Sequence, residues 1–209
     1  MKIELERVAP MEIEARSFEI IGQELPHSID ETLAPIIKRV IHTTADFDYV
    51  DNLCFSAGVL DRALRAIHDG AAIVTDTTMA MSGINKKALA KHGGEALCFI
   101  GDTDVVEAAK RAGTTRAVQA MEKASRLDRP LIFAIGNAPT ALIHIYELIS
   151  EGRLDPRLVI GVPVGFVNVV QSKELIMTAD VPYIVARGRK GGSNVAAAIC
   201  NALLYMLGR

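Results

Sequence analysis

Short apolar runs alternate with helical patterns from about residue 53 to residue 186. Between the runs, apolar residues recur at helical spacing, as Val59, Ala63 and Ile67 do before Gly70. The runs are LCF (53–55), AIVT (72–75), ALCFI (96–100), LIFAI (131–135), LVIGV (158–162) and YIVA (183–186). Such alternation is typical of right-handed βαβ units. We therefore expect a single-domain α/β fold with a doubly wound, mostly parallel sheet of about five to six strands and helices on both faces.

Two helices are expected before the first strand. Pro10 can occupy the first turn of one of them. The apolar residues that would then share a face are Phe18, Ile21 and Leu25. A second apolar stripe covers residues 33–41, with Ser28 and Glu31 at capping-box spacing in front of it. Because Pro35 interrupts this stripe, the second helix either begins near that residue or is kinked there.

Length and charge limit the alternatives. The 209 residues suffice for one sizeable core, and no repeat or low-complexity linker divides them. We expect one domain over residues 1–209. Half of the residues are hydrophobic, only 5% are aromatic, and the formal net charge is -2. No overall basic field therefore favours nucleic acid or a membrane surface as a partner.

The cellular location follows from three further features. The start, MKIELERVAP, lacks the apolar centre of a signal peptide. The longest apolar stretch, 195–207, contains Asn201 and is shorter than the ~20 residues that a membrane span needs. The three cysteines are far apart, which is typical of a reducing compartment rather than of a disulfide framework. We expect a cytoplasmic protein.

Polar and basic turns follow the predicted strands. In open sheets of this type, ligands bind beyond the carboxyl ends of the strands. Gly191 and Gly192 would let the backbone approach a ligand, and Ser193 is expected to cap the last helix. The cations that gather in these turns are Lys86, Lys87, Arg187, Arg189 and Lys190. A glycine-rich, basic turn before a helix predicts an anion site, and phosphate and carboxylate both fit it.

Known cofactor motifs are absent. The turn GRKGGS has no lysine before its serine, so it is not a P-loop, and no G-x-G-x-x-G follows a strand. The five histidines include no H-x-x-x-H pair and have no nearby cysteine. We therefore predict that the protein needs neither a nucleotide cofactor nor a metal.

One histidine has a distinctive environment. His42 ends the 33–41 stripe and is followed by Thr43, Thr44, Asp46 and Asp48. A histidine beside carboxylates at a helix C-terminus is suited to general acid catalysis. The same arrangement would equally well serve to cap the helix, because imidazolium is stabilised at that end of the helix dipole. The pattern by itself leaves both roles open.

Several longer motifs resemble one family. They are PMEIEARSFEII (10–21), RVIHTTADFDY (39–49), GNAPTAL (136–142), PVGFVN (163–168) and RGRKGGSNVAAAICNAL (187–203). Together they resemble the precorrin-8X and cobalt-precorrin-8 methylmutases of corrin-ring biosynthesis, over about residues 10–204. The combination of E-x-R-S-F with I-H-T-T-A-D-F is specific to that family.

The resemblance implies an isomerase of cobalamin biosynthesis that moves a methyl group from C11 to C12 of the macrocycle, giving hydrogenobyrinate or cobyrinate. It implies no cofactor, a tetrapyrrole substrate, and a homodimer with active sites near its interface. The substrate carries many carboxylates, which gives the basic turns a purpose. The motifs do not tell whether that substrate contains cobalt. A non-catalytic corrinoid carrier and a sugar-phosphate isomerase are the alternatives.

The resemblance also assigns residues. His42 matches the family's proton donor, Ser17 its substrate-contacting serine, and Arg116 an arginine that pairs with a substrate carboxylate. Further substrate contacts rest on loop position as much as on the resemblance. They are Arg16, Thr43, Thr78, Lys86, Asn137 and Ser193.

Overall fold

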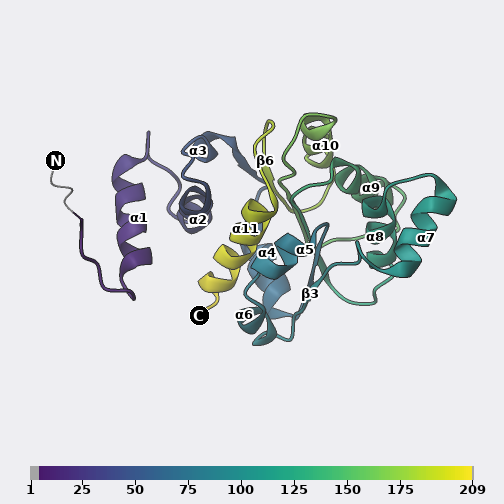
Figure 1. Cartoon of the computed structure of the whole chain (residues 1–209), viewed down its shortest axis with the longest axis horizontal. Helices are drawn as coiled ribbons and strands as arrows, with labels where there is room; N and C mark the ends of the chain where they lie inside the picture. The colour runs from purple at the N-terminus through teal and green to yellow at the C-terminus, as the bar shows by residue number, and fades with distance from the viewer. Residues whose placement is uncertain (1–4, 209) are drawn as a thin grey trace.

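The computed structural model describes residues 5–208 (Figure 1). Its strands are β1 (Leu53–Phe55), β2 (Ala72–Thr75), β3 (Ala96–Leu97), β4 (Leu131–Ile135), β5 (Leu158–Gly161) and β6 (Tyr183–Ala186). Its helices are α1 (Ile13–Glu24), α2 (Ala34–Thr44), α3 (Tyr49–Asn52), α4 (Val59–His68), α5 (Thr78–Gly83), α6 (Lys86–Ala90), α7 (Thr103–Ala112), α8 (Arg116–Ala124), α9 (Pro139–Ser150), α10 (Val169–Ile176) and α11 (Ser193–Met206).

The strands form one six-stranded sheet in the order β1-β6-β5-β4-β2-β3. β1 runs antiparallel to β6, and the remaining neighbours are parallel. The predicted mostly parallel α/β fold is thus confirmed, and four of the predicted runs coincide with strands. The run 96–100 is the clear exception, since β3 ends at Leu97. β3 lies at the sheet edge with β2 as its strand partner. Phe99 and Ile100 leave the strand and pack against a core cluster.

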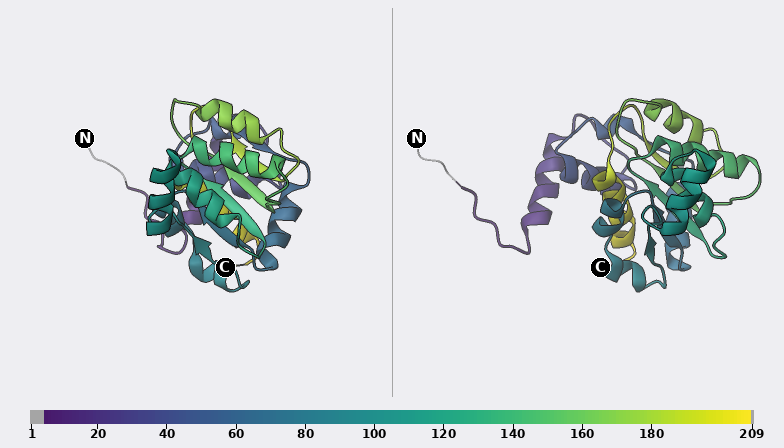
Figure 2. Two further views of the ribbon diagram at one scale, coloured as in Figure 1. Left: turned by 90° about the vertical axis from the view of Figure 1, so that its right-hand side faces the viewer. Right: turned by 45° about the vertical axis from the view of Figure 1, so that its right-hand side comes forward.

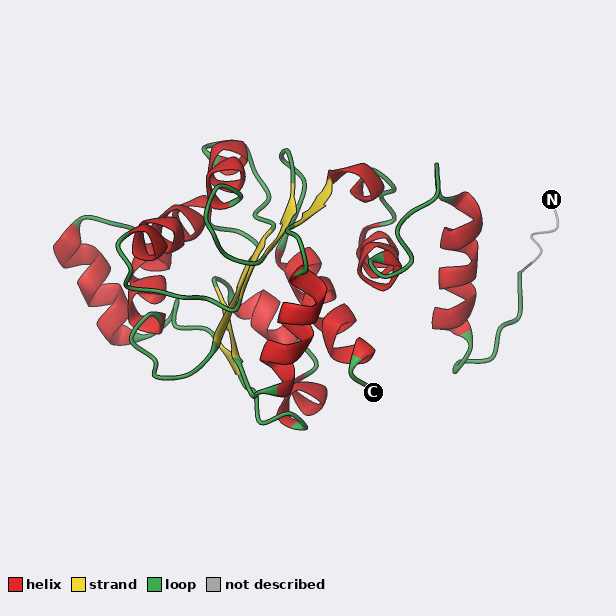
Figure 3. Cartoon of the chain, turned by 180° about the vertical axis from the view of Figure 1, so that it is seen from behind, coloured by secondary structure: helices red, strands yellow, loops and turns green. Residues whose placement is uncertain are grey.

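Helices cover both faces of the sheet (Figure 3). Successive strand residues point to opposite faces, so Ile132 joins one core cluster and Phe133 the other. The first cluster lies under α2, α4, α5, α6 and α11, and the second under α7, α8, α9 and α10. The stripe Val59, Ala63 and Ile67 is buried, as its helical spacing predicts.

The N-terminal helices differ from expectation at their starts. α1 begins at Ile13, after a turn that contains Pro10. The capping box at Ser28 and Glu31 is wrong: α2 begins at Ala34, and the Asp30 carboxylate accepts hydrogen bonds from the N–H and hydroxyl of Thr32. The expected face of α1 is confirmed, because Ile21 is buried and its partners Phe18 and Leu25 pack against the core.

The first helix lies at the side of the molecule, whereas the last helix is packed in its interior. α1 contacts α2 at one side of the molecule, and the residues before α1 lead away from the sheet (Figure 2). α11 lies between α2, α4 and α5, and most of its residues are buried. None of the helices formed by residues 5–208 combines the length and the apolarity needed to cross a membrane.

Candidate active site at the carboxyl ends of the strands

A buried carboxylate joins the ends of β2 and β4. Asp76 follows β2 directly and is 2% exposed. Its Oδ1 accepts the N–H of Gly136 at 2.9 Å, and its Oδ2 accepts the N–H groups of Asn137 and Ala138 at 2.8 and 2.6 Å. Burial raises the pKa of Asp76, and the three N–H groups oppose that shift. Because α9 begins at Pro139, Asp76 also occupies the N-terminal end of that helix.

The start of α11 lies beside the same ends of β2 and β4. A Cβ atom on Gly136 would lie 2.7 Å from Ser193 Cα, so β4 approaches α11 as closely as glycine allows. Thr77 Oγ1 and Ser193 Oγ are 2.7 Å apart and hydrogen bonded. The prediction that Ser193 caps α11 is wrong. The cap is Gly192, whose φ of 140° suits glycine, and Ser193 is the first helical residue.

The predicted basic turn, residues 187–192, lies beside the end of β5. Gly192 N–H donates to Val162 O at 2.9 Å. The Arg189 guanidinium lies over the Phe166 ring, 5.4 Å from its centroid, and Arg187 Nε is 3.3 Å from a Glu174 carboxylate oxygen. The same edge exposes apolar side chains, namely Val164, Phe166 and Val167 after β5 and Met79 on α5. This edge therefore offers both cationic and apolar contacts to a ligand.

His42 lies in the last turn of α2, as predicted, and its side chain is exposed. Its ring meets Phe18 of α1 edge-on, with centroids 5.5 Å apart. Within residues 5–208 its imidazole has no hydrogen-bond partner. In the described part of the chain no hydrogen bond or ion pair joins His42 to Asp46 or Asp48; both carboxylates instead lie 2.6 Å from Lys190 Nζ. That contact lowers the pKa of Asp46 and brings the end of α2 to the basic turn.

Two helices supply three more predicted residues. The hydroxyl of Ser17 on α1 donates to Ile13 O at 2.8 Å, and that of Thr43 on α2 donates to Arg39 O at 3.0 Å. Both hydroxyl oxygens keep acceptor capacity for a ligand. The Arg16 guanidinium is already paired with two carboxylates, those of Glu6 and Glu19.

Arg116, Thr78 and Asn137 each stand at or just before the start of a helix. Arg116 is the first residue of α8 and is exposed, as are Thr78 at the start of α5 and Asn137 after β4. Thr115 Oγ1 is 3.1 Å from Thr140 Oγ1 in the first turn of α9, which fixes the start of α8 beside the turn that contains Asn137.

Lys86 is not brought to this edge within one chain. Its neighbour Asn85 donates through its backbone N–H to Asn201 Oδ1 and through Nδ2 to the Tyr205 hydroxyl, at 2.8 and 3.2 Å. Asn201 and Tyr205 belong to the last turns of α11, whose first residue is Ser193. A helix rises about 1.5 Å per residue, so Asn201 and Tyr205 lie about 12 and about 18 Å along α11 from Ser193.

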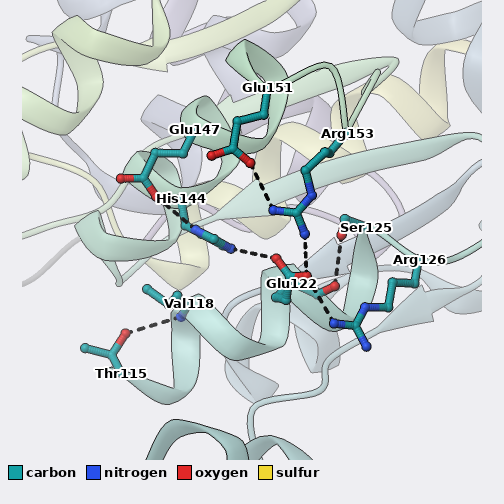
Figure 4. A network of polar contacts seen from close by, with 9 residues as sticks. All are labelled: Thr115, Val118, Glu122, Ser125, Arg126, His144, Glu147, Glu151 and Arg153. Atoms are coloured by element: carbon teal, nitrogen blue, oxygen red, sulfur yellow. Dashed lines mark hydrogen bonds and ion pairs between the residues drawn. The ribbon is translucent and has the colours of Figure 1, made fainter. Parts of the chain in front are cut away.

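A network of polar contacts between α8 and α9 involves His144 (Figure 4). Its Nδ1 is 3.0 Å from Glu147 Oε2, and its Nε2 is 3.2 Å from Glu122 Oε2. Glu122 also accepts hydrogen bonds from Arg126 and Arg153. His144 therefore ties α9 to α8.

Three residues with contacts at this edge were missed by the sequence reasoning: Asp76, Thr77 and Lys173, whose Nζ donates to Gly188 O and Lys190 O. Asp76 and Thr77 directly follow β2, whose residues are all buried. A carboxylate directly after a fully apolar run is visible in the sequence and could have indicated Asp76. Lys173 carries no comparable signal, because it lies in a helix between Ser172 and Glu174. Residues 5–208 contain no group of three or more His, Cys, Asp and Glu residues that could hold a metal ion.

Comparison with known proteins identifies the family. A family model described as precorrin-8X methylmutase matches residues 12–206. The chain belongs to the precorrin-8X methylmutase family. The match covers α1 through α11, so it includes every candidate site residue, and the protein is an isomerase of the methylmutase type that acts in cobalamin biosynthesis.

Three members of the family illustrate the likeness. The chain is 48% identical to the cobalt-precorrin-8 methylmutase of Salmonella typhimurium, over 95% of this chain and 96% of the relative. It is 47% identical to the enzyme of the same name from Priestia megaterium, over 94% and 88%. A crystal structure of precorrin-8X methylmutase from Thermus thermophilus superimposes with a TM-score of 0.84 at 40% identity, covering 93% of this chain and 96% of that one.

Proposed function

We propose that the protein moves a methyl group from C11 to C12 of precorrin-8X or cobalt-precorrin-8, with His42 as the proton donor. The product is hydrogenobyrinate or cobyrinate. The observation that carries the role of His42 is its place at the end of α2: its exposed imidazole has no hydrogen-bond partner within residues 5–208 and lies on the helix end that Lys190 ties to the strand-end loops. Histidine is the side chain most often used for general acid catalysis.

The chemistry follows from the conjugated ring of the substrate. Protonation of that ring by the His42 imidazole would draw electron density away from the carbon that carries the methyl group. This lowers the barrier to methyl migration, and the site of protonation selects the product tautomer. Phe18 meets the imidazole ring edge-on, which restricts its orientation.

Substrate binding would use both kinds of contact at the strand ends. The carboxylates of the substrate would pair with Arg116 and Arg189, and its macrocycle would lie against the exposed Phe166 and Val167. The polar residues proposed to complete the site are Ser17, Thr43, Thr78, Asn137 and Ser193. We assign no contact to Lys86 within one chain, and Arg16 would have to release Glu6 or Glu19 before it could bind a carboxylate.

The proposal includes a homodimer in the cytoplasm. Met11, in the turn before α1, and Ile13, its first residue, are 94% and 53% exposed, which supports a second copy of the chain as the cover of this end of the helix. The cysteines Cys54, Cys98 and Cys200 are all free thiols, as a reducing compartment favours. Sedimentation equilibrium measures the mass in solution, and a monomer at micromolar concentration would contradict the dimer.

Turnover tests the proposed reaction. Purified protein is mixed separately with precorrin-8X and with cobalt-precorrin-8, and the absorption spectrum is followed. We expect a catalytic change of chromophore with no change in mass. The faster of the two forms identifies the metal state of the natural substrate. A spectral shift that stops at one equivalent of protein would indicate a carrier, and no change with either tetrapyrrole would refute the proposal.

Replacement of His42 tests the proton donor. His42→Ala should abolish conversion while product binding persists, because the carboxylate contacts remain. His68→Ala is the matched control, since His68 is exposed at the end of α4 and is hydrogen bonded to Asp69. The control should keep full activity. Near wild-type turnover by His42→Ala would remove His42 from the mechanism.

A further inference from the structure

Lys173 is a buried cation whose partners are two carbonyl groups. It lies on α10, and its side chain is among the fully buried ones. Its Nζ donates to Gly188 O and to Lys190 O, both at 2.8 Å. Within residues 5–208 no carboxylate forms an ion pair with it. The ammonium group is therefore compensated by the backbone of one loop, residues 187–192.

Packing does not explain a lysine at this position. Removing an ammonium group from water without a counter-ion is costly, and burial lowers the pKa of Lys173 to about 8. A methionine would fill nearly the same space without that cost. What lysine adds is a pair of charge-assisted hydrogen bonds to the loop.

The loop held by Lys173 is also tightly joined to the strand ends. Gly192 N–H donates to Val162 O, and Gly165 N–H donates to Arg189 O at 3.2 Å. At Gly191, a Cβ atom would lie 2.1 Å from Val162 O. These contacts leave the backbone of the loop little freedom, and the Lys173 ammonium binds two more of its carbonyls, those of Gly188 and Lys190.

The loop in turn holds the end of the helix that carries His42. Lys190 Nζ contacts Asp46 and Asp48, which follow α2 directly. One of the two carbonyls bound by Lys173 belongs to Lys190 itself. A continuous set of contacts therefore runs from Lys173 through Lys190 to the segment one helical turn beyond His42.

We propose that Lys173 is a positioning residue for the isomerisation: by binding the carbonyls of Gly188 and Lys190, it sets the loop so that Lys190 fixes the end of α2 and orients His42. Lys173 is fully buried and its Nζ donates to two loop carbonyls, so its effect on catalysis passes through Lys190. This inference rests on the proposed role of His42.

A double-mutant cycle tests the route. Lys173→Met removes the donors, and Lys190→Met removes the contact with Asp46 and Asp48. Each should lower kcat about 10- to 100-fold, as a misplaced catalytic group does, with product affinity changed far less. Both substitutions interrupt the same series of contacts, so the kcat of the double variant should be no lower than that of the slower single variant. Lys190→Arg, which can still reach both carboxylates, should recover most of the activity.

Lys123→Met is the matched control. Lys123 Nζ also holds two partners at 2.8 Å, Asp102 and Asp104, but these belong to the start of α7, and Lys123 is in the last turn of α8, so the contact does not involve residues 187–192. This variant should keep wild-type kcat. A wild-type kcat for Lys173→Met, or losses that multiply in the double variant, would overturn the inference.

Amide hydrogen exchange provides a readout that does not depend on turnover. In Lys173→Met, exchange should accelerate in residues 187–192 and in residues 43–48, while β4 and β5 stay protected. Unchanged protection of residues 43–48 would overturn the inference, whether or not the wild type is active. Inactivity of the wild type on both tetrapyrroles would refute the proposed function alone. If Lys173→Met does not fold, Lys190→Met decides the matter through kcat and the same exchange measurement.

Discussion

Replacement of Gly136 by alanine tests the close approach that builds the site. An added Cβ atom would lie 2.7 Å from Ser193 Cα, 2.8 Å from Gly192 O and 2.8 Å from Ser193 N. All three are backbone atoms, so no side chain can rotate away. Ordinary contacts begin at 3.4 Å, and β4 and α11 would therefore have to separate by about 0.7 Å.

The cost follows from that displacement. Overpacking of a well-packed site destabilises by about 1–3 kcal/mol, and a chain of this length loses about 2–4 °C in Tm for each kcal/mol. We expect Tm to fall by about 2–12 °C. Turnover should fall as well, by up to about 100-fold, because Ser193 and the turn before it move relative to the strand ends.

Thermal unfolding and turnover of Gly136→Ala are compared with those of Gly101→Ala. A Cβ atom on Gly101 would meet nothing within 4 Å, so that variant should match the wild type in both assays. The reasoning is refuted if the two alanine variants unfold at the same temperature, since contact with α11 would then cost nothing.

Two further predictions concern charged side chains. Arg116→Ala should weaken product binding, measured by titration, by about 1.5–3 kcal/mol with kcat nearly unchanged, because a charge-assisted hydrogen bond is lost; unchanged affinity would exclude Arg116 from the site. The second rests on the pKa of Lys173, which burial lowers to about 8 from its ordinary 10.5. Between these pH values the unfolded chain binds the proton that the folded chain has lost, so the stability of the wild type relative to Lys173→Met should rise with pH. Urea unfolding of both proteins at pH 7.5 and about pH 10 measures the difference between their free energies of unfolding. A difference that stays constant or falls with pH would contradict this prediction.

The strands were predictable because local sequence determines them. Buried strands of a parallel sheet are apolar along their whole length, and turn residues mark their ends. AIVT and LIFAI therefore match β2 and β4 residue for residue. ALCFI failed because apolar residues also leave an edge strand to pack against a helix layer, as Phe99 and Ile100 do. Sequence periodicity does not tell whether such apolar residues continue the strand or leave it to pack against the helices.

The details of the site depend on partners that are distant in the sequence. Asp46 and Asp48 were expected to flank His42 because they follow it closely, but their partner is Lys190, more than 140 residues away. Lys173 stands between a serine and a glutamate, a pattern typical of a solvent-exposed turn of helix, yet it is buried under a loop that only the fold places there. Local motifs therefore led to the candidate residues, and tertiary contacts determine how the charges around them are paired.

The sheet ends in very short strands on both sides, β1 with three residues and β3 with two. An exposed strand attracts other chains because its unpaired N–H and C=O groups form a template for further pairing, and a short one presents few of them. This sheet is thus a poor template for edge-to-edge aggregation. The two short borders also leave few backbone N–H and C=O groups through which a strand of any other chain could extend the sheet.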